Sequence, residues 1–239
     1  MKLTRQRPAR RPVGVVGLAL AGLALTGCGP SLGIHPGSAV VVDDRTLSMS
    51  HIDTTASLYC KAYIPTIQQQ SSGGAVPMRF IRQFVAASLS ERLIGEQLAE
   101  QYDVKPAKGY AQSQANVRQQ FASAPQDQLD AVLDVEGGDP FLQNVQVAVG
   151  QQLTGNSGEA TADLKAAQQR GQVATQDWLA DHTVEVDPVF GVGVEDGQVQ
   201  VVRDETSYPV SALAVSGAKS GNQPDASYTS SLSPSQLCG

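Results

Sequence analysis

The segment that decides the fold runs from Pro77 to Tyr102 and reads PMRFIRQFVAASLSERLIGEQLAEQY. Its apolar residues recur at every third or fourth position, which is the spacing of one face of an α-helix. The apolar face is broad and comprises Met78, Phe80, Ile81, Phe84, Val85, Leu89, Leu93, Ile94 and Leu98. A face this wide exceeds what one neighbour can cover, so the segment predicts a long helix packed against more than one partner helix.

Further helices are expected on both sides of this segment. A helix capped by Ser48 or Ser50 is expected to extend to about Gln70, and Pro65 is expected to kink it or end it early. On the C-terminal side, the pattern predicts one helix after Pro106 and several more beyond it. The first of these helices is expected to end near residue 121. The others are expected at 126–135, 140–153 and 159–182, with Asp139 as the cap of the helix that starts at Pro140.

Short strands are expected at both ends of the helical region. Residues 38–43 (SAVVVD) are β-rich, Asp43-Asp44-Arg45 predicts a turn, and residues 183–187 and 198–202 alternate as strands do. We expect Val40–Val42 to pair with Val184–Val186. The fold class predicted for residues 37–216 is therefore mostly α, a multi-helix domain with a small sheet that joins the opening hairpin to a C-terminal strand, and residues 29–210 are expected to unfold as one unit.

Residues 217–239 are rich in Ser, Gly and Pro and have few apolar side chains, which predicts an extended tail. The tail ends just past Cys238. Outside the cytoplasm, an even pair of cysteines is more often bridged than free, so we expect a disulfide between Cys60 and Cys238. The alternative is two free thiols, with Cys60 buried as a small apolar residue.

The N-terminus has the order of a secretory signal. The first eleven residues carry five basic side chains and no acid, an apolar run from Val13 to Leu25 follows, and the run ends in Leu25-Thr26-Gly27-Cys28. The apolar run is shorter than the roughly 20 residues that span a bilayer. Leu-Thr-Gly-Cys resembles the lipobox of bacterial lipoproteins, which implies cleavage of a 1–27 signal peptide and lipidation of Cys28. Residues 28–36 would then be a lipidated tether at the extracytoplasmic face of the cell membrane.

Two alternatives to this N-terminal interpretation remain. The chain could be an ordinary secreted protein with a cysteine at this place by chance, or Arg10-Arg11 could direct twin-arginine export. Pro12 follows the arginine pair and the rest of that export motif is absent, which favours the general secretory route.

The charge of the exported chain narrows the possible partners. Residues 1–27 contain five of the 17 basic residues and none of the 23 acidic ones, which leaves 12 basic against 23 acidic residues and a net charge of −11. An acidic surface disfavours nucleic acid, and it disfavours a second, electrostatic attachment to anionic lipid.

Three stretches together resemble the N-terminal chaperone domain of SurA and related SurA/PrsA-like foldases. They are 39–53 (AVVVDDRTLSMSHID), the helix 79–102 followed by Asp103-Val104-Lys105-Pro106, and 183–191 (TVEVDPVFG). The resemblance covers about half of the exported chain. It departs from the family at His51, where an acid usually completes the first helix cap, and in the lack of room for a parvulin isomerase domain. It therefore implies peptide binding without isomerase activity.

Two functions follow from this resemblance. The first is a membrane-anchored holdase chaperone for unfolded exported polypeptides, and the second is a non-catalytic adaptor that binds one folded envelope protein. Candidate peptide-binding residues are Phe80, Phe84, Leu93 and Leu98, although side chains on such a face more often belong to the core. The Gln- and Ala-rich region 143–176 is a second candidate, as an arm that faces the client or as a solvated connecting helix.

No catalytic residue, metal site or cofactor is predicted. His51 and Asp53 lie two positions apart on a helix and therefore diverge, without a third ligand nearby. A hairpin turn accounts for Asp43 and Asp44. The helix dipole accounts for His182 at a helix C-terminus. The sequence has no nucleophile elbow and no phosphate-binding loop.

Overall fold

A computed structural model describes residues 36–70, 75–202, 208–220 and 225–239. The helices are α1 (Met49–Gln70), α2 (Met78–Gln101), α3 (Lys108–Gln120), α4 (Gln126–Thr154), α5 (Thr161–Asp181), α6 (Ala212–Lys219) and α7 (Ala226–Ser230), with the 3-10 turns η1 (Pro188–Phe190) and η2 (Pro234–Gln236). The strands are β1 (Ser38–Val42), β2 (Arg45–Ser48), β3 (Val76–Pro77), β4 (Val184–Val186), β5 (Val192–Glu195), β6 (Gln198–Val201) and β7 (Leu237–Cys238). The mostly helical fold with a small sheet is confirmed.

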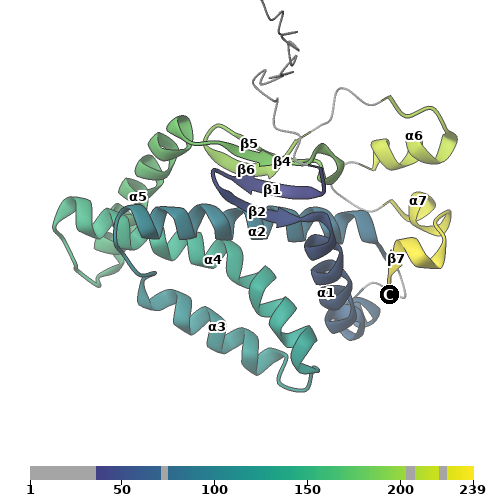
Figure 1. Cartoon of the computed structure of the whole chain (residues 1–239). Coiled ribbons are helices and arrows are strands. Elements are labelled where there is room, and N and C mark those ends of the chain that lie inside the picture. Colours follow the sequence, from purple (N-terminus) through teal and green to yellow (C-terminus); the bar gives the residue numbers. More distant parts are fainter. Residues whose placement is uncertain (1–35, 71–74, 203–207, 221–224) are drawn as a thin grey trace, which may run out of the picture. The chain divides into compact units, whose positions relative to one another are not determined.

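The central helix α2 packs against several neighbours, as its broad apolar face predicted. It contacts α4 and α1 along one side and strands β1 and β6 along another (Figure 1). Val85, Leu89, Ile94 and Leu98 are buried in a core that they share with α1, α4 and β1. This core is mostly aliphatic and so agrees with an aromatic content of only 5%.

The sheet joins the strands that precede and follow helices α1 to α5. Its strand order is β2-β1-β4, all antiparallel, with Val40 opposite Val186 and Val42 opposite Val184. The predicted pairing of these strands is confirmed. Strands β5 and β6 form a separate antiparallel hairpin, of which β5 was not predicted because two of its four residues, Gly193 and Glu195, are poor strand formers.

Of the two predicted caps of α1, Ser48 is the one observed, two residues before Ser50. The Oγ of Ser48 accepts the backbone N–H of His51 at 3.1 Å, so Ser48 is the cap. Asp53, three residues after Ser50, forms an ion pair of 2.5 Å with Arg82 of α2. The helix continues through Pro65 to Gln70, so the proline does not end it.

The two helices expected at 126–135 and 140–153 are one continuous helix, α4, so that prediction was wrong. Pro140 removes one backbone donor, and the prediction took it as a helix start. Tertiary packing overrides this local signal, because α4 crosses α2 closely at Gly138, where a Cβ would overlap the backbone of Ser88. The Ser88 hydroxyl donates to the carbonyl of Val135 in the same turn.

Helices α4 and α5 also approach at positions without a side chain. A Cβ at Gly150 would overlap the carbonyl of Ala167, and a Cβ at Gly171 would overlap the carbonyl of Gln146. Both glycines are buried. Their lack of a Cβ lets the two helix backbones meet over much of their length.

A polar clamp joins the hairpin turn to the end of α5. Asp43 adopts φ 51°, and its carboxylate accepts the backbone N–H of Thr183 at 3.0 Å and contacts His182 Nδ1 at 2.6 Å. The His182 ring also stacks on Trp178, with ring centres 4.1 Å apart. Sequence reasoning assigned Asp43 to a turn and His182 to a helix dipole, and missed that the two residues bind each other.

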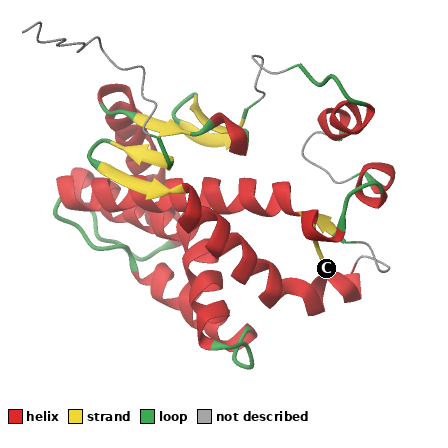
Figure 2. Cartoon of the chain, turned by 45° about the vertical axis from the view of Figure 1, so that its right-hand side comes forward, coloured by secondary structure: helices red, strands yellow, loops and turns green. Residues whose placement is uncertain are grey.

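The C-terminal segment differs from the expected extended tail. It forms α6, α7, η2 and β7, and the boundary drawn at 216/217 falls inside α6. Arg79 of α2 donates to the carbonyl of Gly217 at 2.8 Å, and its guanidinium lies 5.1 Å from the ring centre of the buried Tyr228. These long-range contacts order a segment whose own composition supplies little core (Figure 2).

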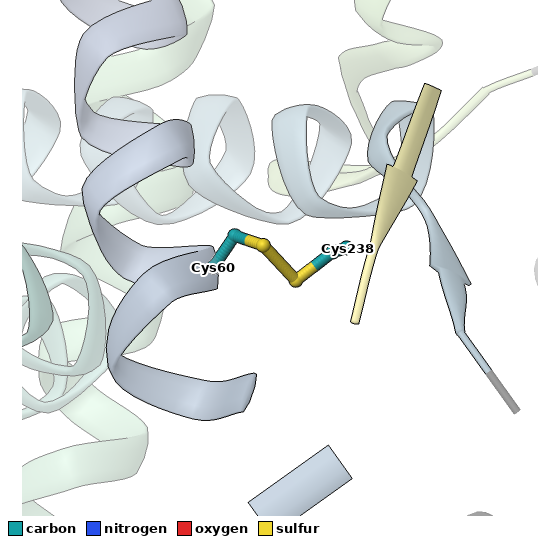
Figure 3. The surroundings of a disulfide bond; sticks show 2 residues. All are labelled: Cys60 and Cys238. Atoms are coloured by element: carbon teal, nitrogen blue, oxygen red, sulfur yellow. A yellow bond between two sulfur atoms is a disulfide. The ribbon is translucent and has the colours of Figure 1, made fainter. Parts of the chain in front are cut away.

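The predicted disulfide between Cys60 and Cys238 is present (Figure 3). It joins α1 to β7, and both cysteines are buried. Strand β7 pairs antiparallel with β3, with Cys238 opposite Val76 and Leu237 opposite Pro77. The end of the chain is therefore held beside the start of α2.

None of the helices in the described ranges combines the length and the apolarity needed to cross a membrane. The predicted signal peptide and most of the tether lie outside the described residues, as does Cys28.

Candidate functional site

A groove runs along the contact of α2 and α4, and we refer to it as the α2–α4 groove. Its first part, the aromatic hollow, has a volume of about 300 Å³. It is lined by Phe84, Ala87, Ser88 and Glu91 of α2 and by Val135, Glu136 and Asp139 of α4. Phe84 is the large apolar side chain here that solvent reaches, with 46% of its surface exposed.

The second part, the amide hollow, has a volume of about 220 Å³ and also borders Glu91 and Asp139. Five glutamines line it, from α4, α5 and the β5–β6 hairpin: Gln143, Gln146, Gln172, Gln176 and Gln198. Apolar contacts come from Ile94, Leu142, Leu179 and Val199. Glu91 and Asp139 border both hollows, and we use the name α2–α4 groove for the two hollows together.

Two tyrosines of α1 hold Glu136 at the aromatic hollow. Tyr59 and Tyr63 both donate their hydroxyls to Glu136 Oε1, at 2.5 and 2.8 Å, and their rings stack 4.5 Å apart. Tyr59 also packs against Phe84, with ring centres 5.8 Å apart. Burial, together with the bonds to Glu136, raises the pKa of both tyrosines above the ordinary value, so both remain protonated donors.

Glu91 borders both hollows and is half-buried. Burial, and then the charge of Asp139, raises the pKa of Glu91 to about 8. Its carboxyl is therefore largely protonated at neutral pH and can donate a hydrogen bond as well as accept one. None of the residues that line the two hollows, all within the described ranges, is basic.

The structure separates the four predicted peptide-binding residues. Leu93 and Leu98 are buried in the core and contribute nothing to an exposed surface. Phe80 is half-buried next to the Arg79 guanidinium, 4.2 Å from its ring centre. Phe84 alone of the four lies in the groove.

The Gln-rich region 143–176 belongs to α4 and α5 and is not a projecting arm. Gln143, Gln146, Gln172 and Gln176 come from that region and face the amide hollow. The carboxyl groups of Glu91 and Glu136 were not singled out from the sequence, and Asp139 was predicted only as a helix cap, which is wrong because it lies inside α4. They lie on two helices that are distant along the chain, and the crossing at Gly138 brings them together.

The chemistry of the groove is that of hydrogen bonding and apolar contact. In the described residues no three His, Cys, Asp or Glu side chains stand where they could hold a metal ion. His51 lies exposed at the start of α1.

Comparison of the chain with protein-family models, with curated proteins and with solved structures finds no match.

Proposed function

We propose that this protein is a membrane-anchored extracytoplasmic lipoprotein that acts as a SurA-like holdase and binds unfolded segments of exported polypeptides in the α2–α4 groove. The observation that carries the proposal is the combination of an exposed Phe84 with a row of glutamine side chains in one groove. The anchor is a diacylglycerol and fatty acid, such as palmitate, on Cys28.

The lining suits sequence-tolerant binding of an extended chain. The amides of the exposed Gln172, Gln176 and Gln198 can donate to a peptide C=O and accept from a peptide N–H. Gln143 and Gln146 use amide donors within the fold, on Asp139 and Thr175. Phe84 offers an apolar contact for side chains that a folded client would bury. Such binding needs no nucleotide, metal or cofactor.

A pair of variants tests the groove. We expect Phe84→Ser to remove about 1–2 kcal/mol of client binding, which is about 5- to 30-fold in affinity. The matched control is Leu153→Ser at the end of α4, because Leu153 is equally exposed (44% against 46%) but does not line the groove. The measurement is the rate at which an unfolded test protein aggregates in the presence of each variant.

The mature protein at several-fold molar excess is expected to slow that aggregation. No effect of the unaltered protein contradicts the holdase function, and equal effects of the two variants contradict its assignment to the groove. Melting curves of both variants check that each one folds.

The adaptor alternative predicts a different cross-linking pattern in cells. A holdase gives many cross-linked products, whereas an adaptor for one folded envelope protein gives one. The small volumes of the two hollows favour short bound segments in either case. We expect no acceleration of proline isomerisation over the uncatalysed rate in a protease-coupled assay.

The anchor has its own test. Changing Cys28 to Ser is expected to reduce metabolic labelling with a fatty acid to background, because the acceptor thiol is lost. Labelling that persists in this variant contradicts lipidation at Cys28.

A further inference from the structure

The exposed large apolar side chains are concentrated in one part of the described chain. Phe84, Leu153 and Val173 are scattered, whereas five others fall between η1 and α6: Val189, Val201, Tyr208, Val210 and Leu213. We call these five residues the tether-side patch. Val210 is 96% exposed and Val189 is 65% exposed, so neither is covered by the rest of the protein.

Part of the patch lies next to the point where the chain enters the fold. The backbone N–H of Asp187, just before η1, donates to the carbonyl of Ala39 in β1, and Val202 donates to Gly191 just after η1. Val189 therefore lies two residues after a residue bonded to the start of β1, and the end of β6 lies next to Gly191, just after η1. Figure 1 shows α6 and strands β4, β5 and β6 above α2.

The opposite side of the fold is occupied by α3, which lies at the bottom of both views. The bond from Arg79 to the carbonyl of Gly217 connects α6 to α2, which holds it to the rest of the fold.

The tether is short. Eight residues, 29–36, separate Cys28 from Gly37, and a fully extended chain of that length reaches at most about 30 Å. A lipid on Cys28 therefore keeps the start of β1 within about that distance of the bilayer surface. Of the tether-side patch, Val189 lies next to this point, in the turn that follows the residue bonded to Ala39.

We propose that the tether-side patch rests on the outer leaflet of the membrane that holds Cys28, so that the lipid and the patch together fix the orientation of the domain. This inference rests on the lipidation of Cys28 in the proposed function. The side chains suit the site, because Val and Leu enter the boundary of the acyl chains and Tyr is favoured at the interface. With α3 on the opposite side, that helix faces away from the membrane.

The contact is apolar and not electrostatic. The exported chain has a net charge of −11, and the five residues of the patch include no basic side chain. Attraction to anionic headgroups therefore contributes nothing favourable, and we expect that salt, which screens electrostatic forces, does not weaken the contact.

The experiment uses the lipidated protein in vesicles of phosphatidylethanolamine and phosphatidylglycerol whose acyl chains carry bromine as a quencher. Single substitutions Val189→Cys and Val210→Cys place a small thiol-reactive dye on the patch, and Gln119→Cys places it on α3 as the matched control. Because Cys60 and Cys238 are bonded to each other and Cys28 is alkylated, the introduced thiol is the reactive one.

We expect the bromolipid to quench the dye at 189 and at 210 at least about two-fold more than the dye at 119, because patch residues reach about 5–10 Å into the interface. Raising the salt concentration is expected not to reduce this difference. Quenching at either patch position that does not exceed that at 119 overturns the proposal.

Two further outcomes also overturn it. If vesicles without bromine reduce the fluorescence equally, another protein surface covers the patch. If the protein does not stay with the vesicles at all, the anchor is absent and the proposed localisation fails together with this inference. A protein that stays with the vesicles without quenching leaves the anchor intact and rejects the orientation alone.

Discussion

Glu136 and Glu91 of the α2–α4 groove differ in the groups that surround their carboxyls. Glu136 receives two tyrosine hydroxyl bonds, whereas Glu91 lies half-buried near the carboxylate of Asp139 without a basic neighbour in the groove lining. Burial, reinforced by Asp139, raises the pKa of Glu91 from 4.5 to about 8. The folded protein therefore holds a proton there that the unfolded chain releases above about pH 4.5.

This difference predicts a pH-dependent effect of Glu91→Gln. Between pH 4.5 and 8 the native state binds more protons than the unfolded state, so the contribution of Glu91 to stability falls as the pH rises through this window. Glutamine has no charge to bury, so at pH 8 we expect the variant to be more stable than the unaltered protein by roughly 1–3 kcal/mol. Urea unfolding at several pH values measures the difference.

Near pH 4 the two proteins are expected to be equally stable, because Glu91 is then protonated in both states. Asp177→Asn is the control, since Asp177 is exposed on α5 and does not line either hollow. A gain that is as large at pH 4 as at pH 8 contradicts the raised pKa.

At the level of elements, close helix contacts set the geometry of the groove. Gly138 lets α4 cross α2 at Ser88, and Gly150 and Gly171 let α4 meet α5. The obstacle to a side chain at these positions is backbone, which cannot move as a flexible side chain does. The helices would have to separate to make room for a methyl group.

Gly150→Ala is therefore expected to destabilise the protein by about 1–3 kcal/mol, as overpacking usually does, although alanine favours the helix more than glycine does. The control is Gly109→Ala in α3, where the nearest atom to a new Cβ is Oδ1 at the end of the half-buried Asn144 side chain of α4. We expect the control to be neutral or slightly stabilising. The melting temperatures of the two variants measure this difference in stability. A Gly150→Ala variant as stable as the unaltered protein contradicts the close contact.

At the level of the whole molecule, the C-terminal segment is held by contacts distant in sequence. The disulfide closes a loop of 178 residues, β7 pairs with β3, and Arg79 binds the carbonyl of Gly217. Residues Ile34–Gly239 form one compact unit that includes this segment. The segment thereby covers the start of α2.

Replacing both cysteines, Cys60→Ala with Cys238→Ala, is expected to destabilise the protein by up to about 4–5 kcal/mol, the value for a loop this long in the chain-entropy treatment. We also expect faster proteolysis of residues 212–239 than of α2, because two-residue pairing with β3 alone holds a chain end weakly. Calorimetry and limited proteolysis of the variant measure both effects.

The control is the unaltered protein under reductant, which is expected to behave as the double variant does. Two reactive thiols in the denatured protein without reductant, or a double variant as stable and as protected as the oxidised protein, contradicts the role of the bond.

The sequence alone determined the features that rest on local pattern. The apolar period of Pro77–Tyr102 predicted α2, the turn at Asp43-Asp44 predicted the opening hairpin, and the alternation near Val184 predicted its partner strand. The cysteine count predicted the disulfide. Each of these signals lies in neighbouring residues or in a simple count, so it can be read without knowing which elements touch.

Only the tertiary structure decided what depends on the contacts between elements. It joined residues 126–154 into one helix through Pro140, because packing against α2 and α5 outweighs one lost backbone bond. It paired Asp43 with His182 and ordered the C-terminal segment through Arg79. It also buried Leu93 and Leu98 while exposing Phe84, since a helix surrounded by several partners leaves open only the part of its apolar face that none of them covers.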